Sequence, residues 1–284
     1  MKKRVAFLII DGKRFGGEES GLNMSFDVRY AGTSLVPLDS TFTLTNLNKF
    51  DMAQVVTNTA RFIDRKRSIE CWAGYYGNIK QIFAGQILQS NPMDMPDTSV
   101  TITAYSGIEM MGKQVNKDWK NAKYIDILEY ATEQCDLQLN LPIDIRRSEI
   151  LQSSIGQNWS FTGSAYQLLR DIQLMLAANN NTKTALSFTI YNGILYIYWE
   201  DKPYPANIPV INKESGLIGI PTPTEQGINL QVLLDVSLSP LQTIYVESDR
   251  LGLYDGTYSI VNIRHHGTLR GNDWYSDLEC VKVR

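Results

Sequence analysis

The chain has two histidines, His265 and His266, and they are adjacent. Histidine is the side chain best suited to proton transfer and metal binding near neutral pH. The residues around the pair alternate between apolar and polar types, which predicts a strand. Adjacent side chains of a strand point to opposite faces, so one imidazole would face inward and the other outward. A hydrogen-bonded histidine at the end of a strand is therefore favoured over a shared metal ion or a catalytic triad.

Other enzyme signatures are absent from the sequence. It contains no Gly-x-Ser-x-Gly, no Gly-x-Gly-x-x-Gly, no phosphate-binding loop and no His-Glu-x-x-His. A glycosidase needs only two carboxylates, so a lysozyme-like, cell-wall-degrading protein stays an alternative. Nothing in the spacing selects a pair among the acidic candidates, which are Glu70, Asp97, Glu247, Asp249, Asp273 and Glu279. No catalytic, metal-binding or cofactor-binding residue is predicted, and the chain is expected to be neither an enzyme nor dependent on a cofactor.

Aromatic residues permit one further alternative, a carbohydrate-binding module whose rings stack on sugars. The candidates are Tyr191, Tyr196, Tyr198, Trp199 and Tyr204. Alternating aromatics in a hairpin are more often core residues and cross-strand pairs, which is the simpler interpretation. The three cysteines are an odd number, widely spaced and set in apolar patterns. They predict reduced, buried thiols rather than a disulfide or a zinc site, and they are Cys71, Cys135 and Cys280.

Size, composition and charge predict a globular protein. The 284 residues, 43% of them apolar and 10% aromatic, suffice for two or three domains of ordinary size. The net charge of −3, with both signs mixed along the chain, argues against a dedicated nucleic-acid binder. One local basic cluster predicts either a solvated loop or a charged contact to a neighbouring subunit; its members are Arg61, Arg65, Lys66 and Arg67.

The apolar run from Val5 to Ile10 is six residues long. A bilayer crossing needs about eighteen, and Asp11-Gly12 ends the run too early for a signal peptide. The run therefore predicts a strand, with no export by such a signal and no membrane insertion.

The first part of the chain, residues 1–107, alternates with a period of two. Strands are predicted at 5–10, 22–30, 41–47, 68–72, 82–88 and 99–105, with a short helix or turn at 46–55. Several alternating strands with little helix predict a β-sandwich or barrel.

The period changes in residues 108–203, which predict a small α+β domain. Apolar residues recur at three and four positions from Lys123 to Cys135, which indicates an amphipathic helix. A second helix follows Ser164 as its N-cap. Residues 186–191 and 194–199 predict a hairpin, because Asn192-Gly193 supplies the positive φ angles of a two-residue turn.

Residues 204–284 predict a second mainly β domain. Prolines in residues 201–209 mark the boundary before it. Strands are predicted within 216–234 and at 243–248, followed by a terminal hairpin from about Tyr254 to Cys280.

The terminal hairpin has an earlier counterpart in the chain. Gly85 and Asp97 are 12 residues apart, and Gly256 and Asp273 are 17 apart; each pair opens with an aromatic residue two positions before the glycine and ends in an alternating strand. The difference in length fits in a loop. Residues 68–73 can likewise be set against 243–248. The sequence predicts an internal repeat of two β-domains, with the α+β domain inserted between them.

Three stretches resemble the baseplate hub proteins of tailed bacteriophages: Ile69 to Tyr75 leading to Ile82–Ile87, Leu217 to Pro221 leading to Gln226–Ile228, and Gly256 to Gly267 leading to Asp273–Trp274. The resemblance spans nearly the whole chain and depends mostly on glycine and apolar positions in a fixed order. Related hub domains occur in the spike proteins of type VI secretion systems, and the fold resembles that of the tail-tube subunit.

The resemblance implies a structural virion protein. Two tail-tube-like β-barrel or sandwich domains would flank the α+β domain, and a homotrimer would present six similar domains around a channel. Such a hub would be a symmetry adapter between the six-fold tail tube, or a distal tail protein, and the three-fold central spike. Other implied partners are further baseplate components and the tape measure protein, with DNA passing without specific binding. The implied location is the tail baseplate, assembled in the cytoplasm of the host bacterium.

Overall fold

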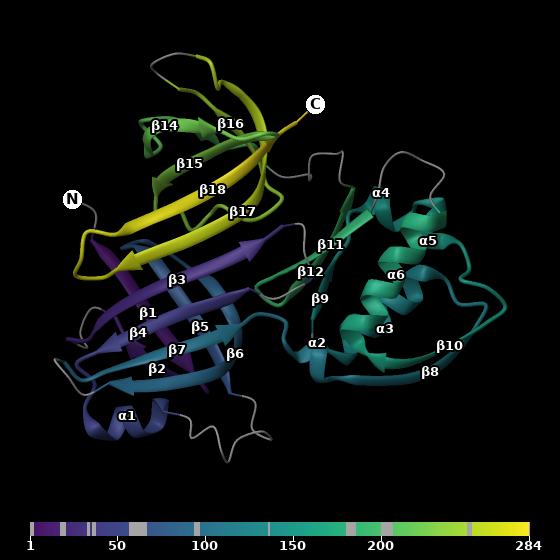
Figure 1. Ribbon diagram of the computed structural model, residues 1–284, viewed down its shortest axis with the longest axis horizontal. Helices are drawn as coiled ribbons and strands as arrows, with labels where there is room; N and C mark the ends of the chain where they lie inside the picture. Colours follow the sequence, from purple (N-terminus) through teal and green to yellow (C-terminus); the bar gives the residue numbers. More distant parts are fainter. Residues whose placement is uncertain are drawn as a thin grey trace.

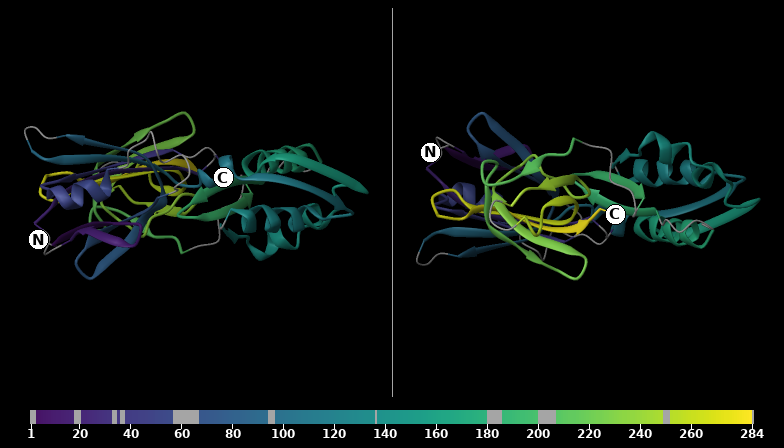
Figure 2. Two further views of the ribbon diagram at one scale, coloured as in Figure 1. Left: turned by 90° about the horizontal axis from the view of Figure 1, so that it is seen from below. Right: turned by 90° about the horizontal axis from the view of Figure 1, so that it is seen from above.

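The computed structural model describes residues 3–17, 21–32, 35, 38–56, 67–93, 97–135, 137–179, 186–199, 207–248 and 252–283. One long sheet forms one side of the molecule, and a unit of helices and short sheets forms the other (Figure 1). Both views in Figure 2 show this unit extending the molecule away from the long sheet. The predicted fold class, mainly β with an α+β insertion, is confirmed.

The first run of strands follows the predicted alternation, because apolar residues at every second position give each strand one buried side. β3, for example, buries Met24, Phe26, Val28 and Tyr30. The described elements of this run are β1 (Arg4–Ile10), β2 (Lys13–Gly16), β3 (Asn23–Ala31), β4 (Asp39–Thr45), α1 (Lys49–Val55), β5 (Ser68–Tyr75), β6 (Asn78–Met93) and β7 (Ser99–Tyr105).

The last part of the chain forms the second run. Its terminal hairpin is confirmed, with residues 269–273 as the loop between the two strands. The described strands are β13 (Val210–Ile211), β14 (Leu217–Pro223), β15 (Gly227–Leu233), β16 (Thr243–Val246), β17 (Gly256–Thr268) and β18 (Trp274–Lys282).

Both runs belong to one sheet. Its order is β14-β15-β18-β17-β3-β4-β7-β6-β5-β1-β2, and β16 pairs with both β13 and β17. The runs meet where β17 pairs antiparallel with β3. They also share one apolar core, in which the rings of Phe26 and Trp274 meet edge to face at 5.3 Å. The division of the chain at 107 and 203 stays a prediction, and residues 200–206 lie outside the described residues.

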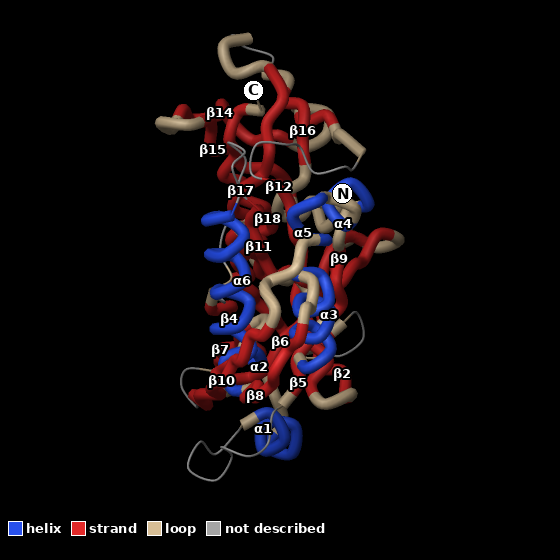
Figure 3. Tube along the Cα trace, turned by 90° about the vertical axis from the view of Figure 1, so that its right-hand side faces the viewer, coloured by secondary structure: helices blue, strands red, loops and turns tan. Residues whose placement is uncertain are grey.

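The segment between the two runs has a core of its own. β8 and β10 form a two-stranded ribbon, and β11, β12 and β9 form a small sheet. α3 and α6 lie side by side (Figure 3). The described elements are α2 (Glu109–Gly112), β8 (Gln114–Lys120), α3 (Tyr124–Gln134), β9 (Gln138–Asn140), α4 (Ile143–Arg146), α5 (Glu149–Gln152), β10 (Asn158–Ser164), α6 (Ala165–Asn179), β11 (Leu186–Tyr191) and β12 (Ile194–Trp199).

Local signals in this segment act as the sequence predicts. The backbone N–H of Gln167 donates to Ser164 Oγ at 3.2 Å, and the backbone N–H of Ser164 donates to Gln167 Oε1 at 2.9 Å. This reciprocal pair satisfies amide groups that the first turn of α6 leaves free. Asn192 and Gly193 have φ angles of 49° and 75°, as the two-residue turn between β11 and β12 requires.

The small sheet is fixed to the end of β3 by hydrogen bonds. Tyr198 Oη donates to the Gly32 carbonyl at 2.6 Å, and Thr189 Oγ1 donates to the Ala31 carbonyl at 2.7 Å. Tyr30 Oη donates to Asn192 Oδ1 at 2.6 Å. The α+β segment is thereby held against the first run of strands.

Candidate interaction face of the long sheet

One face of the long sheet is packed on the core, and the opposite face carries mainly hydroxyl, amide and charged side chains. Directly paired residues of neighbouring strands point to the same face, so the strand registers define this polar face. On β3, β4, β7, β15, β17 and β18 its hydroxyl, amide and charged members include Asn23, Ser25, Asp27, Arg29, Asp39, Thr41, Thr43, Thr45, Ser99, Thr101, Thr103, Asn229, Gln231, Asn262, Arg264, His266, Thr268, Asp277 and Glu279.

A charged network crosses the junction of β17 and β3. Arg264 donates to both carboxylate oxygens of Asp27 at 2.9 and 2.7 Å, and Arg29 does so at 3.1 and 3.0 Å. Arg264 and Arg29 are directly paired across the two strands, so the carboxylate separates two like charges. Burial alone would raise the pKa of Asp27, but the hydrogen bonds and charges of the two arginines lower it to about 2.

Asp277 extends the network onto β18 and β15. Its Oδ2 lies 3.1 Å from His266 Nε2 and 3.7 Å from Arg264 Nη1, and its Oδ1 accepts a hydrogen bond from Gln231 at 2.7 Å. Burial acts to raise the pKa of this carboxyl, but the hydrogen bonds from His266 and Gln231 outweigh burial and lower it. Four strands are thus joined by side-chain contacts on the polar face.

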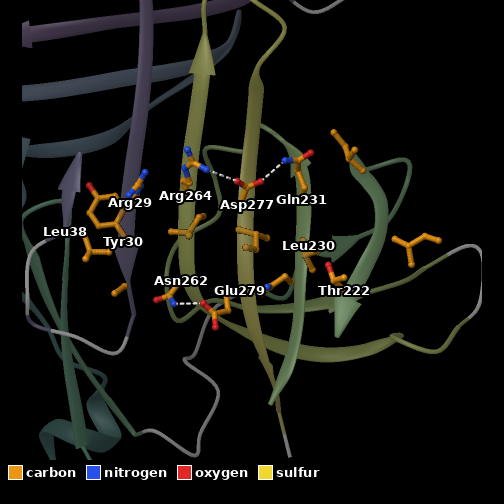
Figure 4. A pocket seen from close by; sticks show the side chains of 16 residues that line it. Arg29, Tyr30, Leu38, Thr222, Leu230, Gln231, Asn262, Arg264, Asp277 and Glu279 are labelled. Carbon is orange, nitrogen blue, oxygen red and sulfur yellow. Dashed lines mark hydrogen bonds and ion pairs between the residues drawn. The ribbon is translucent and has the colours of Figure 1, made fainter. Parts of the chain in front are cut away.

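An open groove of about 680 Å³ lies over this network. Arg264, Asp277 and Gln231 line it and are joined by the dashed interactions in Figure 4. Exposed apolar side chains line it as well, Ile218 and Ile220 of β14 together with Leu38. The groove therefore combines a paired, charged surface with an apolar margin at the edge strand.

Replacing Asp27 with Asn is expected to lower the free energy of unfolding by roughly 1 to 2 kcal/mol at pH 7, because two facing arginines lose their shared carboxylate. The pKa of Asp27 is about 2 in the folded protein against an ordinary 3.8. Its contribution is therefore present above pH 3.8 and lost as pH falls through 2. Urea unfolding at pH 7 and pH 2 measures both effects.

The matched control for this prediction is Asp118→Asn on the exposed side of β8. It is expected to change the free energy of unfolding by less than about 0.5 kcal/mol. An Asp27→Asn variant as stable as the wild type at pH 7 would show that the network contributes nothing.

The two histidines face opposite sides of the sheet, as predicted. His265 is fully buried, and its Nδ1 lies 2.8 Å from Ser276 Oγ. His266 is half-buried on the polar face beside Asp277. Among the described residues, no group of three or more His, Cys, Asp and Glu side chains could hold a metal ion.

The acidic candidates do not form an evident catalytic pair. Glu70 accepts a hydrogen bond from Trp72 Nε1 at 2.8 Å, Glu247 from Asn212 at 3.2 Å, and Glu279 from Asn262 at 2.6 Å. Asp97 precedes β7, and Asp273 lies in the β17–β18 loop. These carboxylates occupy five different places in the fold, and Asp249 lies outside the described residues.

The aromatic candidates mostly take part in packing between segments. Tyr198 is buried and bonded to Gly32, and Tyr191 meets Tyr30 edge to face at 4.5 Å. Burial raises the pKa of Tyr191 and of Tyr196. These three tyrosines therefore do not form an exposed sugar-stacking patch, Trp199 is half-buried, and Tyr204 lies outside the described residues.

The cysteine prediction is confirmed, because Cys71, Cys135 and Cys280 are buried thiols and none of them forms a disulfide. Burial raises the pKa of Cys71 and raises that of Cys280 to about 12. Of the basic cluster, Arg67 is described and bonds Asp11 at 2.6 Å. Its other members, Arg61, Arg65 and Lys66, lie outside the described residues.

The network around Asp27 was not anticipated from the sequence. Asp27 and Arg264 are 237 residues apart and meet only because β17 pairs with β3. The sequence signal that could have placed these two residues on one polar face is the alternation of polar and apolar positions along β3 and β17.

A protein-family model described as "Baseplate hub gp41" matches residues 5–280. The chain belongs to this family. Membership supports a structural role in the tail of a bacteriophage virion, and it confirms the family predicted by the resemblance. A search of curated proteins found no match to the sequence.

Solved structures share the fold of this hub-family chain. The 43 kDa tail protein of prophage MuSo2 from Shewanella oneidensis aligns with a TM-score of 0.62 at 10% identity, covering 99% of this chain and 98% of that one. A tail protein from Neisseria meningitidis MC58 aligns with a TM-score of 0.62 at 9% identity, covering 99% and 97%. At such identities the likeness shows the fold.

A third similar structure belongs to a secretion system. The E. coli c3393 protein, described as a type VI component with structural similarity to T4 tail proteins gp27 and gp5, aligns with a TM-score of 0.60 at 10% identity. The match covers 98% of this chain and 77% of that one. No helix among the described residues has the length and apolar composition needed to span a bilayer.

Proposed function

We propose that three copies of this chain form the hub ring of a phage tail baseplate, joining the six-fold tail tube to the three-fold central spike around a channel. The observation that carries the proposal is the single sheet built from two runs of strands in the same order. A ring of three contacts a ring of six evenly when each member offers two similar surfaces. The chain would then be the symmetry adapter between tube and spike.

The polar face supplies a suitable channel wall. On β3, β4, β17 and β18 it carries four carboxylates, Asp27, Asp39, Asp277 and Glu279, together with Arg29 and Arg264, which both bond Asp27, and His266, which lies beside Asp277. Unpaired lysines and arginines are what bind DNA phosphates strongly. A wall of this composition lets DNA and the tape measure protein pass without being retained.

The proposed partners are the tail tube or a distal tail protein, the central spike and further baseplate components. The fold shared with tail proteins and with a type VI component supports this set of partners. Assembly would take place in the host cytoplasm, and the chain would contribute no chemistry. The carboxylates of Glu70, Glu247 and Glu279 each accept a hydrogen bond from a neighbouring side chain. These contacts support a structural rather than a catalytic role for the three residues.

The test is the mass of the purified protein in solution, combined with class averages from electron microscopy. We expect a trimer that appears as a ring with a central hole and six similar lobes. A compact monomer at every accessible concentration would refute the ring. Separately, peptidoglycan cleavage that disappears on changing one carboxylate would refute the non-enzymatic role.

A further inference from the structure

The two runs of strands have equivalent neighbours. In the first, the order is β3-β4-β7-β6-β5, and in the second it is β14-β15-β18-β17-β16, with antiparallel pairing throughout. β14 therefore corresponds to β3, and β17 corresponds to β6.

A β-bulge fixes the correspondence residue by residue. The pairing of β6 with β7 shifts between Ile87 and Gln89, and that of β17 with β18 shifts between Ile260 and Asn262. Bulges insert one extra residue and bend the strand. Aligned on the bulges, Met93 of β6 corresponds to His266 of β17, and the sequence-based match of Gly85 with Gly256 is two residues off.

At its bulge, β17 changes partner. Residues 256–259 pair with β16, and residues 262–268 pair with β3. β6 behaves in the same way up to its bulge, because residues 78–86 pair with β5. Beyond it, residues 88–93 have no partner strand on that side within the described part of the chain. None of the described strands therefore occupies, beside β6, the position that β3 occupies beside β17.

The outer edge of β14 is open as well. β14 ends the strand order and pairs only with β15 among the described strands. Since β14 corresponds to β3, the strand that would fill the position beside β6 is β14, and it must come from another copy.

We infer that the open stretch of β6 in one copy lies with its end, at Pro92 and Met93, against the end of β14, at Thr222 and Pro223, of a second copy, repeating the β17–β3 junction between chains. The inference rests on the proposed ring and names the surfaces that close it. A head-to-tail contact of this kind joins two different patches, and it closes after three copies if each chain spans one third of a turn.

The side chains at the two edges fit this contact. Leu88 and Met93 are 52% and 56% exposed, and Ile218 and Ile220 of β14 are 36% and 48% exposed. Large apolar side chains gathered at two open edges indicate surfaces that are covered in an assembly. The contact would bury Met93 against β14 of the second copy, where Ile220 and Ile218 precede Thr222 on the same strand.

Prolines limit how much backbone pairing the junction can make. The Thr224 amide donates to the Gly227 carbonyl, so Pro223, one residue earlier, faces the open edge of β14. Pro92 lies in the open stretch of β6. Proline lacks an amide donor and protects an edge strand from indiscriminate pairing. Recognition would therefore depend on the apolar side chains and on carbonyl acceptors.

The registers also predict which residues meet. Thr103 pairs with the first β6 residue after the bulge, and Glu279 pairs with the first β17 residue after the bulge. Thr103 therefore corresponds to Glu279. Thr41 pairs with Thr103, and Asn229 pairs with Glu279. Thr41 therefore corresponds to Asn229.

One further step reaches the edge strands. Asp27 pairs with Thr41, and Thr222 pairs with Asn229, so Asp27 corresponds to Thr222. Within the chain, His266 of β17 pairs with Asp27 of β3. Between chains, the equivalent pair is Met93 with Thr222.

The test is a double variant, Met93→Cys with Thr222→Cys, oxidised and separated on a non-reducing gel. Both positions are exposed, so the substitutions should not disturb the fold. The three native cysteines are buried, so they should not form crosslinks of their own. We expect covalent trimers from the double variant and none from either single variant. The matched control pairs Thr222→Cys with Leu174→Cys, a 59% exposed position on α6, and should stay uncrosslinked.

Parallel mass measurement separates the two proposals. A trimer in solution without the Met93–Thr222 crosslink would overturn the named junction and leave the ring intact. A monomer at all concentrations would overturn both. Crosslinking that is equal in the control pair would reflect collisions and also count against the junction.

A second variant tests the apolar contact without cysteines. Ile220→Asp, at an exposed position, should weaken trimer formation at least tenfold while leaving the circular dichroism spectrum unchanged. An unchanged monomer–trimer equilibrium would contradict the junction.

Discussion

Replacing Gly267 with Val should lower the free energy of unfolding by roughly 3 kcal/mol. Gly267 lies near one end of the junction of the two runs, paired with Phe26 on β3 and with Trp274 on β18. A Cβ at this position would lie 2.6 Å from a Trp274 ring carbon and 2.8 Å from a Phe26 ring carbon. Both rings are almost fully buried and pack on each other, so neither can move away freely.

Two opposing effects decide the size of this change. Valine favours the extended backbone over glycine by up to about 1 kcal/mol. Overpacking a closed core commonly destabilises by about 1 to 3 kcal/mol, and more when backbone must shift. Here the added atoms meet two rings on two strands, so the overpacking effect is expected to dominate.

Urea unfolding followed by tryptophan fluorescence measures the difference. Thr268→Val is the matched control, because it adds a valine to the next position of the same strand, on the opposite face. The control should stay within about 0.5 kcal/mol of the wild type. A Gly267→Val protein that is as stable as this control would mean that the junction is loosely packed.

Strand positions were predictable because they depend on local periodicity. β3 and β7 alternate over their full length, and the Asn192-Gly193 turn and the Ser164 cap are set by neighbouring residues. One buried face requires an apolar residue at every second position, so sequence spacing alone carries that information.

Strand pairing between distant segments was not predictable in this way. The residues of β17 contain no local signal for pairing with β3, so the contact of Arg264 with Asp27 cannot be predicted from the sequence. The internal repeat was found from its glycines, but the register is set by the bulges after Ile87 and Ile260. The bulges occupy equivalent positions and align Gly85 with Tyr258, whereas the aromatic-x-Gly motif of the sequence aligns Gly85 with Gly256, two residues away.

His265 should make the fold sensitive to mild acid. It is fully buried, and its register partner Ser276 accepts a hydrogen bond from the Asp235 amide. The Ser276 hydroxyl can then donate to His265 Nδ1, which suits a neutral imidazole. Burial lowers the pKa of His265 from 6.5 to about 4, with a smaller opposing effect from Asp235 and Asp277 and a contribution in the same direction from His266.

The sign of the pH effect follows from this difference. The unfolded chain binds the proton near pH 6.5, whereas the folded protein resists it until about pH 4. The stability contributed by neutral His265 is therefore complete above pH 6.5 and is lost as pH falls to about 4. At 1.36 kcal/mol for each pH unit between the two pKa values, the loss is roughly 3 kcal/mol.

His265→Asn removes the titrating group and should flatten the dependence of the unfolding free energy on pH between 6.5 and 4, although the variant itself is less stable at pH 7. Urea unfolding at several pH values, at one protein concentration, measures the slope. His266→Asn, on the opposite face, keeps the buried imidazole and should keep most of the slope of the wild type, because burial is the largest cause of the lowered pKa of His265 and His266 adds a smaller effect. This window lies above that of Asp27, whose contribution disappears between pH 3.8 and about 2, so the two groups are separable in one titration. A His265→Asn protein that loses stability as steeply as the wild type would show that another group drives the change.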